Sequence, residues 1–480
     1  MTAIDALVVG AGPNGLAAAV VLARAGLAVT VLERGTTIGG GARTAEVTLP
    51  GFRHDLGSAV HPMAVASPFF RRFRLADRVP FLTPELSYAH PLEDGRAALA
   101  WRDLRRTASG LGADGPAWSR LLGPLVARAA QVARFTGGPV LRVPADPITA
   151  LRFGLAVLDQ GLPGWNRRWR DLEAAALLTG VMAHTIRPMP AIGPAAAGLA
   201  LAVAGHAGGW PIPVGGSQAI VDALAADLVA HGGRIETGRD VRGPADLPSA
   251  AAVLFDTSVP ALLAIAGDRV PAPRRALLAR FRFGDGVGKV DYALDGPVPW
   301  ANEESRRAVT LHLGGTRPEI AAAERAVARG RVPERPYVLV SQPTVLDPTR
   351  APAGRHVLWA YTHLPNGSGI DPTELITSRV EHYAPGFRDL VLASNANSAA
   401  DMERYDPNYG GGDIAAGAVD VRQLVARPLP SADPWRIAKG VYLCSAAAAP
   451  GPGVHGQPGY LAARSVLRHE FGVRTPPVLH

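Results

Sequence analysis

The sequence reads Val8-Val9-Gly10-Ala11-Gly12-Pro13-Asn14-Gly15 and, after a run rich in alanine and leucine, Val29-Thr30-Val31-Leu32-Glu33. The apolar residues 6–9 predict a short buried strand of a parallel sheet. Residues 16–25 predict a helix that ends before Gly26, a natural C-terminal stop. Residues 28–32 predict a second buried strand. This order of strand, helix and strand is typical of a dinucleotide-binding βαβ unit.

The glycines of the first strand–helix turn have separate predicted roles. Gly10 permits the tight turn, Gly12 lets the backbone approach a pyrophosphate, and Gly15 lets the helix pack close to the strand. Pro13 and Asn14 lie in the turn before the predicted helix, whose N-terminus offers free N–H groups and a dipole that favour phosphate. We therefore predict that all five residues bind a cofactor.

Glu33 is the acidic residue that follows the second strand, 18 residues after Gly15. A carboxylate at this position can accept both ribose hydroxyls, and it would repel a 2′-phosphate. We assign the next residue, Arg34, to the same cofactor site. The alternative is an ordinary glycine turn, which would not require Glu33.

A second glycine cluster follows at Ile38-Gly39-Gly40-Gly41-Ala42-Arg43-Thr44. Glycines just past the acidic residue allow a second close approach of the backbone to the diphosphate, and Arg43 offers a charge-assisted contact. We assign Gly40, Gly41, Ala42 and Arg43 to the cofactor site. A flexible loop is the alternative. Together the two clusters favour FAD over NAD.

Length and composition limit the class of protein. A chain of 480 residues predicts two domains, and 48% hydrophobic with 19% charged residues is typical of a globular protein. The net charge of +8 comes from scattered arginines without a basic patch, so we expect no nucleic-acid partner. The single cysteine, Cys444, excludes an internal disulfide and a cysteine-based metal site, and we predict no metal and a cytoplasmic location.

No apolar run approaches the ~18 residues of a membrane-spanning helix. No amphipathic anchor stands out either, so peripheral membrane contact is left open.

The C-terminal segment predicts a second wall of the same site. Residues 440–445 predict a strand, residues 450–456 form a glycine-rich loop, and a helix is expected from Gly459 to His469. Residues 451–456 match the Gly-x-Gly-x-x-Gly spacing, but no second strand and acidic residue follow, so we reject another dinucleotide unit. A loop before a helix N-terminus still makes a cradle for an electron-rich group. A surface loop capping the last helix is the alternative.

With these motifs the chain resembles the phytoene desaturase-like and amine oxidase superfamily of FAD-dependent oxidoreductases. The nearest subgroup resembles pyridine nucleotide-disulfide oxidoreductase domain-containing protein 2. The resemblance covers nearly the whole chain. Besides the two glycine clusters and the C-terminal loop, it rests on Gly51-Phe52-Arg53-His54-Asp55, Ser58-Ala59-Val60-His61-Pro62, Gly215-Gly216-Ser217-Gln218 and Asn408-Tyr409 with Gly411-Gly412-Asp413. No cysteine pair exists for thiol–disulfide chemistry.

The resemblance implies an α/β fold: a Rossmann-like, glutathione reductase-like FAD domain with an α+β substrate domain. We expect the FAD domain from residues 1–65, 211–290 and 405–480. The substrate domain would comprise residues 66–210, expected to be helical, and residues 291–404, expected to form a mixed sheet.

The resemblance also assigns further residues to the flavin site. A strand leading to Val241 would place its backbone against the adenine, and the C-terminal loop would hold the isoalloxazine ring. The cofactor residues implied in this way are Ser58, Ala59, Val60, Val241, Ser445, Gly453, Val454 and His455.

Three side chains are candidates for catalysis. Lys289 looks like the lysine that amine oxidases present to flavin N5, and it is one of only two lysines in a chain that otherwise uses arginine. Lysine can lose its proton when desolvated, whereas arginine cannot. His61 and His455 lie in segments that the superfamily places near the flavin ring. The alternatives are a solvated lysine and two structural histidines.

These features predict an FAD-dependent dehydrogenase or desaturase of an apolar small organic substrate. Hydride would pass from a C–H bond to flavin N5, with dioxygen or another acceptor reoxidising the flavin. The alternatives are an amine or amino-acid oxidase, a flavin-dependent isomerase without net redox change, and a non-catalytic FAD-binding interaction protein.

Overall fold

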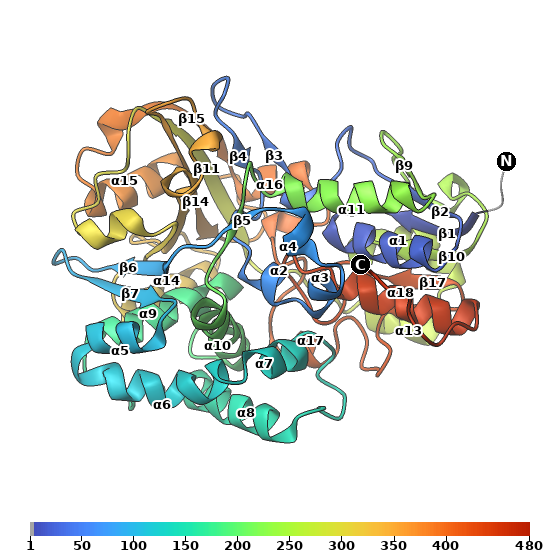
Figure 1. Cartoon of the computed structure of the whole chain (residues 1–480), viewed down its shortest axis with the longest axis horizontal. Helices are drawn as coiled ribbons and strands as arrows, with labels where there is room; N and C mark the ends of the chain where they lie inside the picture. Colours follow the sequence, from blue (N-terminus) through green and yellow to red (C-terminus); the bar gives the residue numbers. More distant parts are fainter. Residues whose placement is uncertain (1–3) are drawn as a thin grey trace.

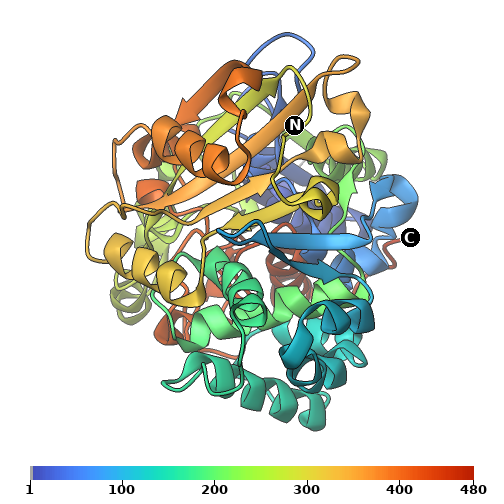
Figure 2. The same ribbon diagram turned by 90° about the vertical axis from the view of Figure 1, so that its left-hand side faces the viewer.

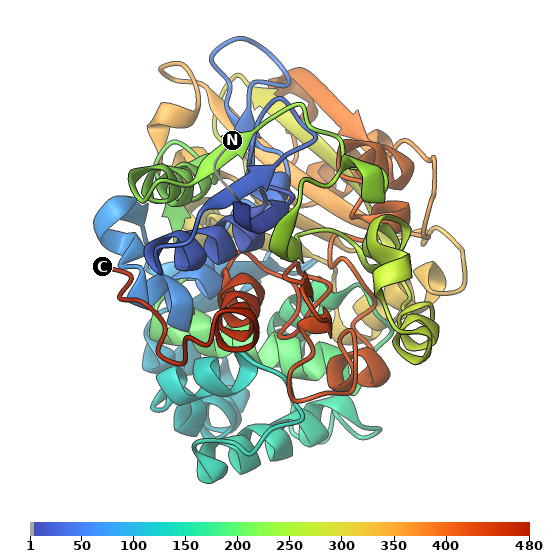
Figure 3. The ribbon, with the colours of Figure 1, turned by 90° about the vertical axis from the view of Figure 1, so that its right-hand side faces the viewer.

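The computed structural model describes residues 4–480, so the first three residues of the predicted FAD segment lie outside it. One half of the molecule is built on a six-stranded sheet (Figures 1 and 3). All neighbouring strands pair in parallel except β16 and β17, which are antiparallel. In spatial order the strands are β16 (Arg436–Ala438), β17 (Val441–Leu443), β10 (Ala250–Phe255), β1 (Ile4–Val9), β2 (Val29–Leu32) and β9 (Arg234–Glu236).

The predicted βαβ unit is the centre of this half. Helix α1 (Pro13–Arg24) begins with a proline, which is tolerated at the first helical position because no N–H is lost there. Its residues from Asn14 to Ala23 are buried, because the helix is enclosed by β1, α11 (Gln218–Ala230) and α18 (Gln457–Glu470). Figure 1 shows α11 and α18 on either side of α1.

The other half contains a seven-stranded sheet, which faces the viewer in Figure 2. Its pairs are antiparallel except for a short parallel pair between β12 and β6. In spatial order the strands are β15 (Val391–Asn397), β11 (Gly286–Leu294), β14 (His356–Leu364), β13 (Val338–Ser341), β12 (Thr310–Leu313), β6 (Leu86–Pro91) and β7 (Ala97–Trp101).

Helices cover one side of this sheet and connect the two halves. The bundle below it in Figure 1 comprises α5 (Leu104–Gly110), α6 (Gly115–Val126), α7 (Ala129–Thr136), α8 (Pro147–Gly161), α9 (Leu172–Met182) and α10 (Ile192–Ala207). The remaining helices are α2 (Pro62–Ala66), α3 (Pro68–Arg72), α4 (Leu75–Arg78), α12 (Val259–Ala266), α13 (Ala272–Leu278), α14 (Arg317–Val327), α15 (Thr373–Tyr383), α16 (Ala399–Tyr405) and α17 (Val421–Val425). Within residues 4–480 no helix has the length and apolar character needed to cross a membrane.

The prediction that residues 66–210 are helical is wrong in two places: at the short strand β5 (Phe81–Leu82), which pairs with β8 (Ile212–Pro213), and at β6 and β7. Strands β6 and β7 form a hairpin and complete the sheet of the distant residues 286–397. Strand β6 is buried along its whole length, so it lacks the alternation of polar and apolar residues that marks a half-buried strand. The Asp94-Gly95 turn, with a φ of +80° at Gly95, is the hairpin signal that was available in the sequence.

Two predicted boundaries also differ from the structure. The predicted domain boundary at residue 290 falls inside β11, which is buried and hydrogen-bonded on both edges within the second sheet. The strand predicted to lead to Val241 ends at Glu236. Gly238, with a φ of +67°, turns the chain there, and its N–H donates to the carbonyl of Gly35 (2.9 Å).

Candidate functional site

A cavity of about 870 Å³ runs from the first glycine turn into the space between the second sheet and the helical bundle. Its lining includes eighteen of the predicted site residues: Gly10, Gly12, Pro13, Asn14, Glu33, Arg34, Gly40, Gly41, Arg43, Ser58, Ala59, Val60, His61, Val241, Lys289, Ser445, Gly453 and Val454. Gly15, Ala42 and His455 are not part of this lining. The three segments that sequence reasoning placed at one cofactor are thus brought to one continuous space.

The first glycine turn packs against Asp256, a residue that the sequence analysis did not single out. The N–H of Gly15 donates to Oδ2 of Asp256 (2.8 Å). A Cβ at Gly12 would lie 2.6 Å from the same oxygen, and a Cβ at Gly15 would lie 2.4 Å from the carbonyl oxygen of Gly10. Both positions therefore require glycine for protein packing alone.

Burial raises the pKa of Asp256 to about 7, and the nearby carboxylates of Asp406 and Glu33 act in the same direction. Asp256 is therefore largely uncharged below neutral pH. A neutral acid beside the turn repels an anionic ligand less than a carboxylate does.

Glu33 ties the glycine turn to the end of β2. Its Oε2 accepts the N–H of Ala11 (2.8 Å), and its Oε1 accepts the N–H of Gly35 (2.7 Å). Each carboxylate oxygen has a second lone pair, so both remain able to accept a ligand hydroxyl. The predicted carboxylate is therefore in place and held in a fixed orientation.

The second glycine cluster packs directly on the first. The N–H of Gly39 donates to the carbonyl of Ala11 (2.9 Å), and a Cβ at Gly40 would lie 3.3 Å from the Cα of Gly12. A Cβ at Gly41 would lie 2.1 Å from the hydroxyl of Tyr409. The absence of side chains at Gly40 and Gly41, which we predicted to admit a diphosphate, is thus also required by contacts within the protein.

Arg43 is held against Tyr405, another residue that sequence reasoning missed. Its Nε donates to the Tyr405 hydroxyl (3.0 Å) and to the carbonyl of Gly40 (3.1 Å). The guanidinium carbon lies 4.2 Å from the centre of the Tyr405 ring. Arg43 is therefore a fixed positive charge in the wall of the cavity.

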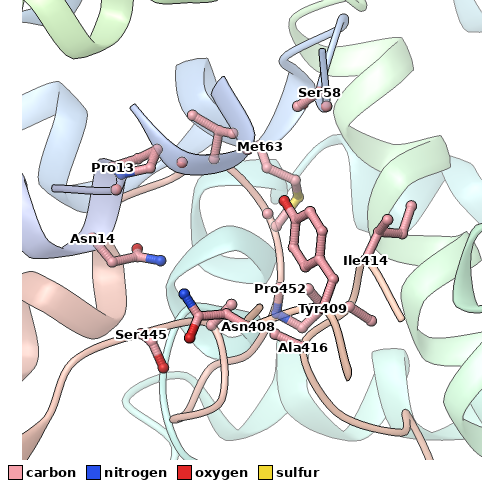
Figure 4. A pocket seen from close by; sticks show the side chains of 18 of the residues that line it. Pro13, Asn14, Ser58, Met63, Asn408, Tyr409, Ile414, Ala416, Ser445 and Pro452 are labelled. Carbon is pink, nitrogen blue, oxygen red and sulfur yellow. The ribbon is translucent and has the colours of Figure 1, made fainter. Parts of the chain in front are cut away.

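The middle of the cavity is seen in Figure 4. Asn14 and Asn408 point toward one another from opposite walls, and Tyr409 stands next to them. Oδ1 of Asn14 is buried and has no hydrogen-bond partner among the described residues. A buried acceptor without a partner is a natural place for a ligand hydrogen bond.

His61 is buried and hydrogen-bonded to the second segment of the nucleotide half. The hydroxyl of Ser217 donates to the carbonyl of Ser58 (2.5 Å), so the Nε2–H of His61 must donate to the Ser217 oxygen (2.7 Å). This tautomer leaves Nδ1 as an acceptor with no partner in the described part of the chain. Burial lowers the pKa of His61 to about 4, so the ring is neutral.

His455 does not reach the large cavity. It lines a separate cavity of about 130 Å³ together with Met63, Pro452 and Gln457. The N–H of Gln457 donates to Nδ1 of His455 (3.2 Å), and burial lowers the pKa of the ring to about 4. The geometry therefore supports a structural role for this side chain.

Lys289 lies in the middle of β11 and is only 2% exposed, so it is not the solvated lysine of the alternative interpretation. Its ammonium group is paired with the carboxylate of Asp291 and lies 5.6 Å from the centre of the Trp359 ring. Burial lowers the pKa of Lys289 and raises that of Asp291, while their attraction opposes both shifts. The other lysine, Lys439, is exposed.

The apolar end of the cavity carries a further polar group, His184. Its Nε2 shares a hydrogen bond with Nε2 of His312 (2.9 Å), and Trp210 packs edge-on against both rings. Burial lowers the pKa of His184 to about 3, so the pair is neutral. These residues come from three distant segments, and no local signal in the sequence joins them.

The part of the cavity next to β2 opens to solvent at Arg34, Arg239, Asp240 and Val241. The N–H of Arg239 donates to the carbonyl of Glu33 (2.8 Å). This bond holds residues 239–241 beside Glu33. Val241 therefore lines the cavity on the same side as Glu33, although no strand leads to it.

Comparisons with known proteins agree with this geometry. Residues 8–74 match the family model described as a NAD(P)-binding Rossmann-like domain. The chain is 27% identical to pyridine nucleotide-disulfide oxidoreductase domain-containing protein 2 of Rattus norvegicus, over 97% of this chain and 93% of that protein.

Solved structures share the fold. A triple mutant of putrescine oxidase, redesigned in cofactor binding, superimposes with a TM-score of 0.63 at 16% identity and covers 97% of this chain and 98% of its own. Cyclohexylamine oxidase from Brevibacterium oxydans gives a TM-score of 0.56 at 16% identity, over 96% and 97% of the two chains. The predicted resemblance and the predicted α/β fold with a Rossmann-like domain agree with these comparisons.

Proposed function

We propose that the chain is an FAD-dependent oxidoreductase that dehydrogenates an apolar organic substrate. The observation that carries the proposal is the single cavity that joins a dinucleotide-type turn to an apolar chamber. Pockets that join a cofactor site to a mostly apolar chamber with few polar groups are typical of enzymes acting on small organic molecules.

The residues of the cavity fit FAD. Glu33 would hold the ribose, and the first turn of α1 with Gly12 and Gly40 would face the diphosphate. The unpartnered Oδ1 of Asn14 and the fixed charge of Arg43 offer further polar contacts. When bound, FAD supplies a hydride acceptor at N5.

The apolar end of the cavity suits an apolar substrate. Its walls include Phe135, Phe153, Val157, Trp210 and Trp359. The carboxylates of the cavity are at the dinucleotide end, so no acidic side chain of the apolar lining would pair with a cationic amine. This distribution favours dehydrogenation of an uncharged molecule over amine oxidation.

The direct test of this activity is anaerobic mixing of the purified protein with uncharged apolar compounds and, separately, with primary amines. We expect bleaching of the flavin's visible absorption only with the first group. Bleaching by amines alone would favour the amine oxidase alternative. Product conversion without bleaching would favour an isomerase.

Replacing Lys289 with methionine tests its proposed part in the chemistry. We expect the variant to retain FAD but to reduce its flavin more slowly, because acid–base groups contribute about 10²–10⁴-fold to rates. The measurement is stopped-flow reduction of the flavin. Lys439→Met is the matched control, since it removes the chain's other lysine at an exposed position. Equal rates of flavin reduction in Lys289→Met and the wild type would show that Lys289 takes no part in the chemistry.

Replacing Asp256 with asparagine tests the charge beside the glycine turn. The pKa of about 7 means that Asp256 ionises as the pH rises through neutrality, which adds a negative charge next to the bound diphosphate. We therefore expect FAD affinity of the wild type to fall between pH 6 and pH 8, and that of Asp256→Asn to change much less. Fluorescence titration with FAD measures both. Parallel pH profiles would contradict the assignment.

A further inference from the structure

Helix α8 carries an apolar face that no part of the described chain covers. Ile148, Leu151, Leu155, Leu158 and Leu162 are between 45% and 64% exposed, and their spacing places them on one stripe of the helix. The opposite side of α8 is buried. The preceding loop extends the exposed surface, and we call the whole the α8 face: Val140, Leu141, Val143, Ile148, Leu151, Leu155, Leu158 and Leu162.

The α8 face adjoins the apolar end of the large cavity. Val140 is 51% exposed and also lines the cavity, as does Val421 of α17, which is 53% exposed. Phe153 and Val157, on the inner side of α8, line the cavity as well. The cavity therefore reaches the surface between the α8 loop and α17, which lie in the lower part of Figure 1.

Uncompensated positive charge surrounds this face. The two carboxylates of the segment, Asp146 and Asp159, are paired with Arg128 and Arg168. By contrast, the side chains of Arg134, Arg152 and Arg167 are exposed and form no ion pair among residues 4–480. An apolar stripe flanked by free arginines is the pattern of a helix that lies in the interface of an anionic bilayer.

We propose that the α8 face docks on the surface of an anionic phospholipid bilayer. The leucines enter the boundary between headgroups and acyl chains, and the arginines contact lipid phosphates. The cavity mouth then opens toward the lipid, so that an apolar substrate enters without crossing water; this last step rests on the proposed function, whereas docking does not.

A second copy of the chain is a poorer occupant of the same face. A two-fold interface would bring the same surface of both copies together, and with it the free arginines around the stripe. Chains with a net charge of +8 also repel one another. A lipid phosphate layer has the complementary charge.

The test is flotation of the full, FAD-loaded protein with vesicles. One set contains phosphatidylcholine alone, and the other an equal mixture of phosphatidylcholine and phosphatidylglycerol. We expect the wild type to float with the anionic set. Leu151→Glu/Leu155→Glu should reduce the bound fraction roughly tenfold or more, because the change removes buried apolar area and adds repulsive charge. Val229→Glu/Leu277→Glu, at exposed apolar positions of other helices, should bind as the wild type does.

Arg134→Gln/Arg152→Gln should weaken binding to the anionic vesicles and make that binding less dependent on salt.

Docking is overturned if the wild type does not float, if the Leu151 and Leu155 variant floats equally well, or if sedimentation shows a dimer that this variant dissociates. FAD content and flavin reduction are measured on the same samples. If the wild type contains no FAD, or if its flavin is not reduced, the result counts against the proposed function and not against docking.

Discussion

Glu33→Ala is expected to yield protein that is isolated almost free of FAD. The substitution removes the carboxylate that we propose accepts the two ribose hydroxyls. It also removes the hydrogen bonds that Glu33 accepts from the N–H groups of Ala11 and Gly35 and that hold the turn. Hydrogen bonds to a charged group contribute about 1.5–3 kcal/mol each, so loss of two ribose bonds predicts at least a roughly hundredfold weaker affinity. The measurement is the ratio of flavin to protein absorption, followed by titration with added FAD.

Glu236→Ala is the matched control for this variant, because Glu236 is exposed at the end of the neighbouring strand β9. It should retain the wild-type FAD content. A Glu33→Ala protein as yellow as the wild type would show that the carboxylate does not hold the ribose.

Gly459→Ala is expected to have the largest effect on stability. Helix α18 crosses α1 so closely that a Cβ at Gly459 would lie 1.9 Å from the carbonyl oxygen of Asn14 and 3.0 Å from the N of Ala18. Both are backbone atoms of the helix that begins at the glycine turn, so relief requires the helices to separate. Overpacking of this kind costs about 1–3 kcal/mol, and backbone contacts place this site at the upper end. Thermal unfolding of the cofactor-free protein measures the loss.

Gly154→Ala is the control, because Gly154 is also a helical glycine but a Cβ there would meet nothing within 4 Å. An alanine is expected to stabilise α8 by about 0.5–1 kcal/mol. Equal melting temperatures for Gly459→Ala and the wild type would mean that α1 and α18 can move apart without cost. The packing of the C-terminal segment against the glycine turn would then be wrong.

The sequence was sufficient to predict those parts of the site whose strands, turns and helices follow one another directly in the chain. The β1–α1–β2 unit with Glu33 was predictable because strand, turn and helix follow one another within 30 residues. The C-terminal strand, loop and helix were predictable for the same reason. The burial of Lys289 was not decided by its sequence context, since either a solvated or a buried lysine fits the start of a strand.

Long-range contacts account for what the sequence did not reveal. Asp256 and Tyr405 are ordinary polar residues until β10 and α16 bring them against Gly15 and Arg43. The hairpin of β6 and β7 (residues 86–101) joins a sheet whose other strands lie between residues 286 and 397. Pairing of such distant segments is set by tertiary packing rather than by local propensity.

Helix α8 illustrates a different limit. Its sequence is apolar on two sides, and either side alone would be read as the buried one. Only the fold shows that Phe153 and Val157 face the cavity while Leu151 and Leu155 face outward. An amphipathic anchor was therefore invisible in the sequence, although a helix was expected there.

The most direct measurement is to release and identify the molecule bound to the purified protein. Denaturation followed by chromatography and absorption spectroscopy gives its identity and its ratio to the chain. We expect FAD at close to one molecule per chain. A protein that carries a nicotinamide dinucleotide instead, or that fails to take up FAD when it is supplied in excess, would contradict this expectation.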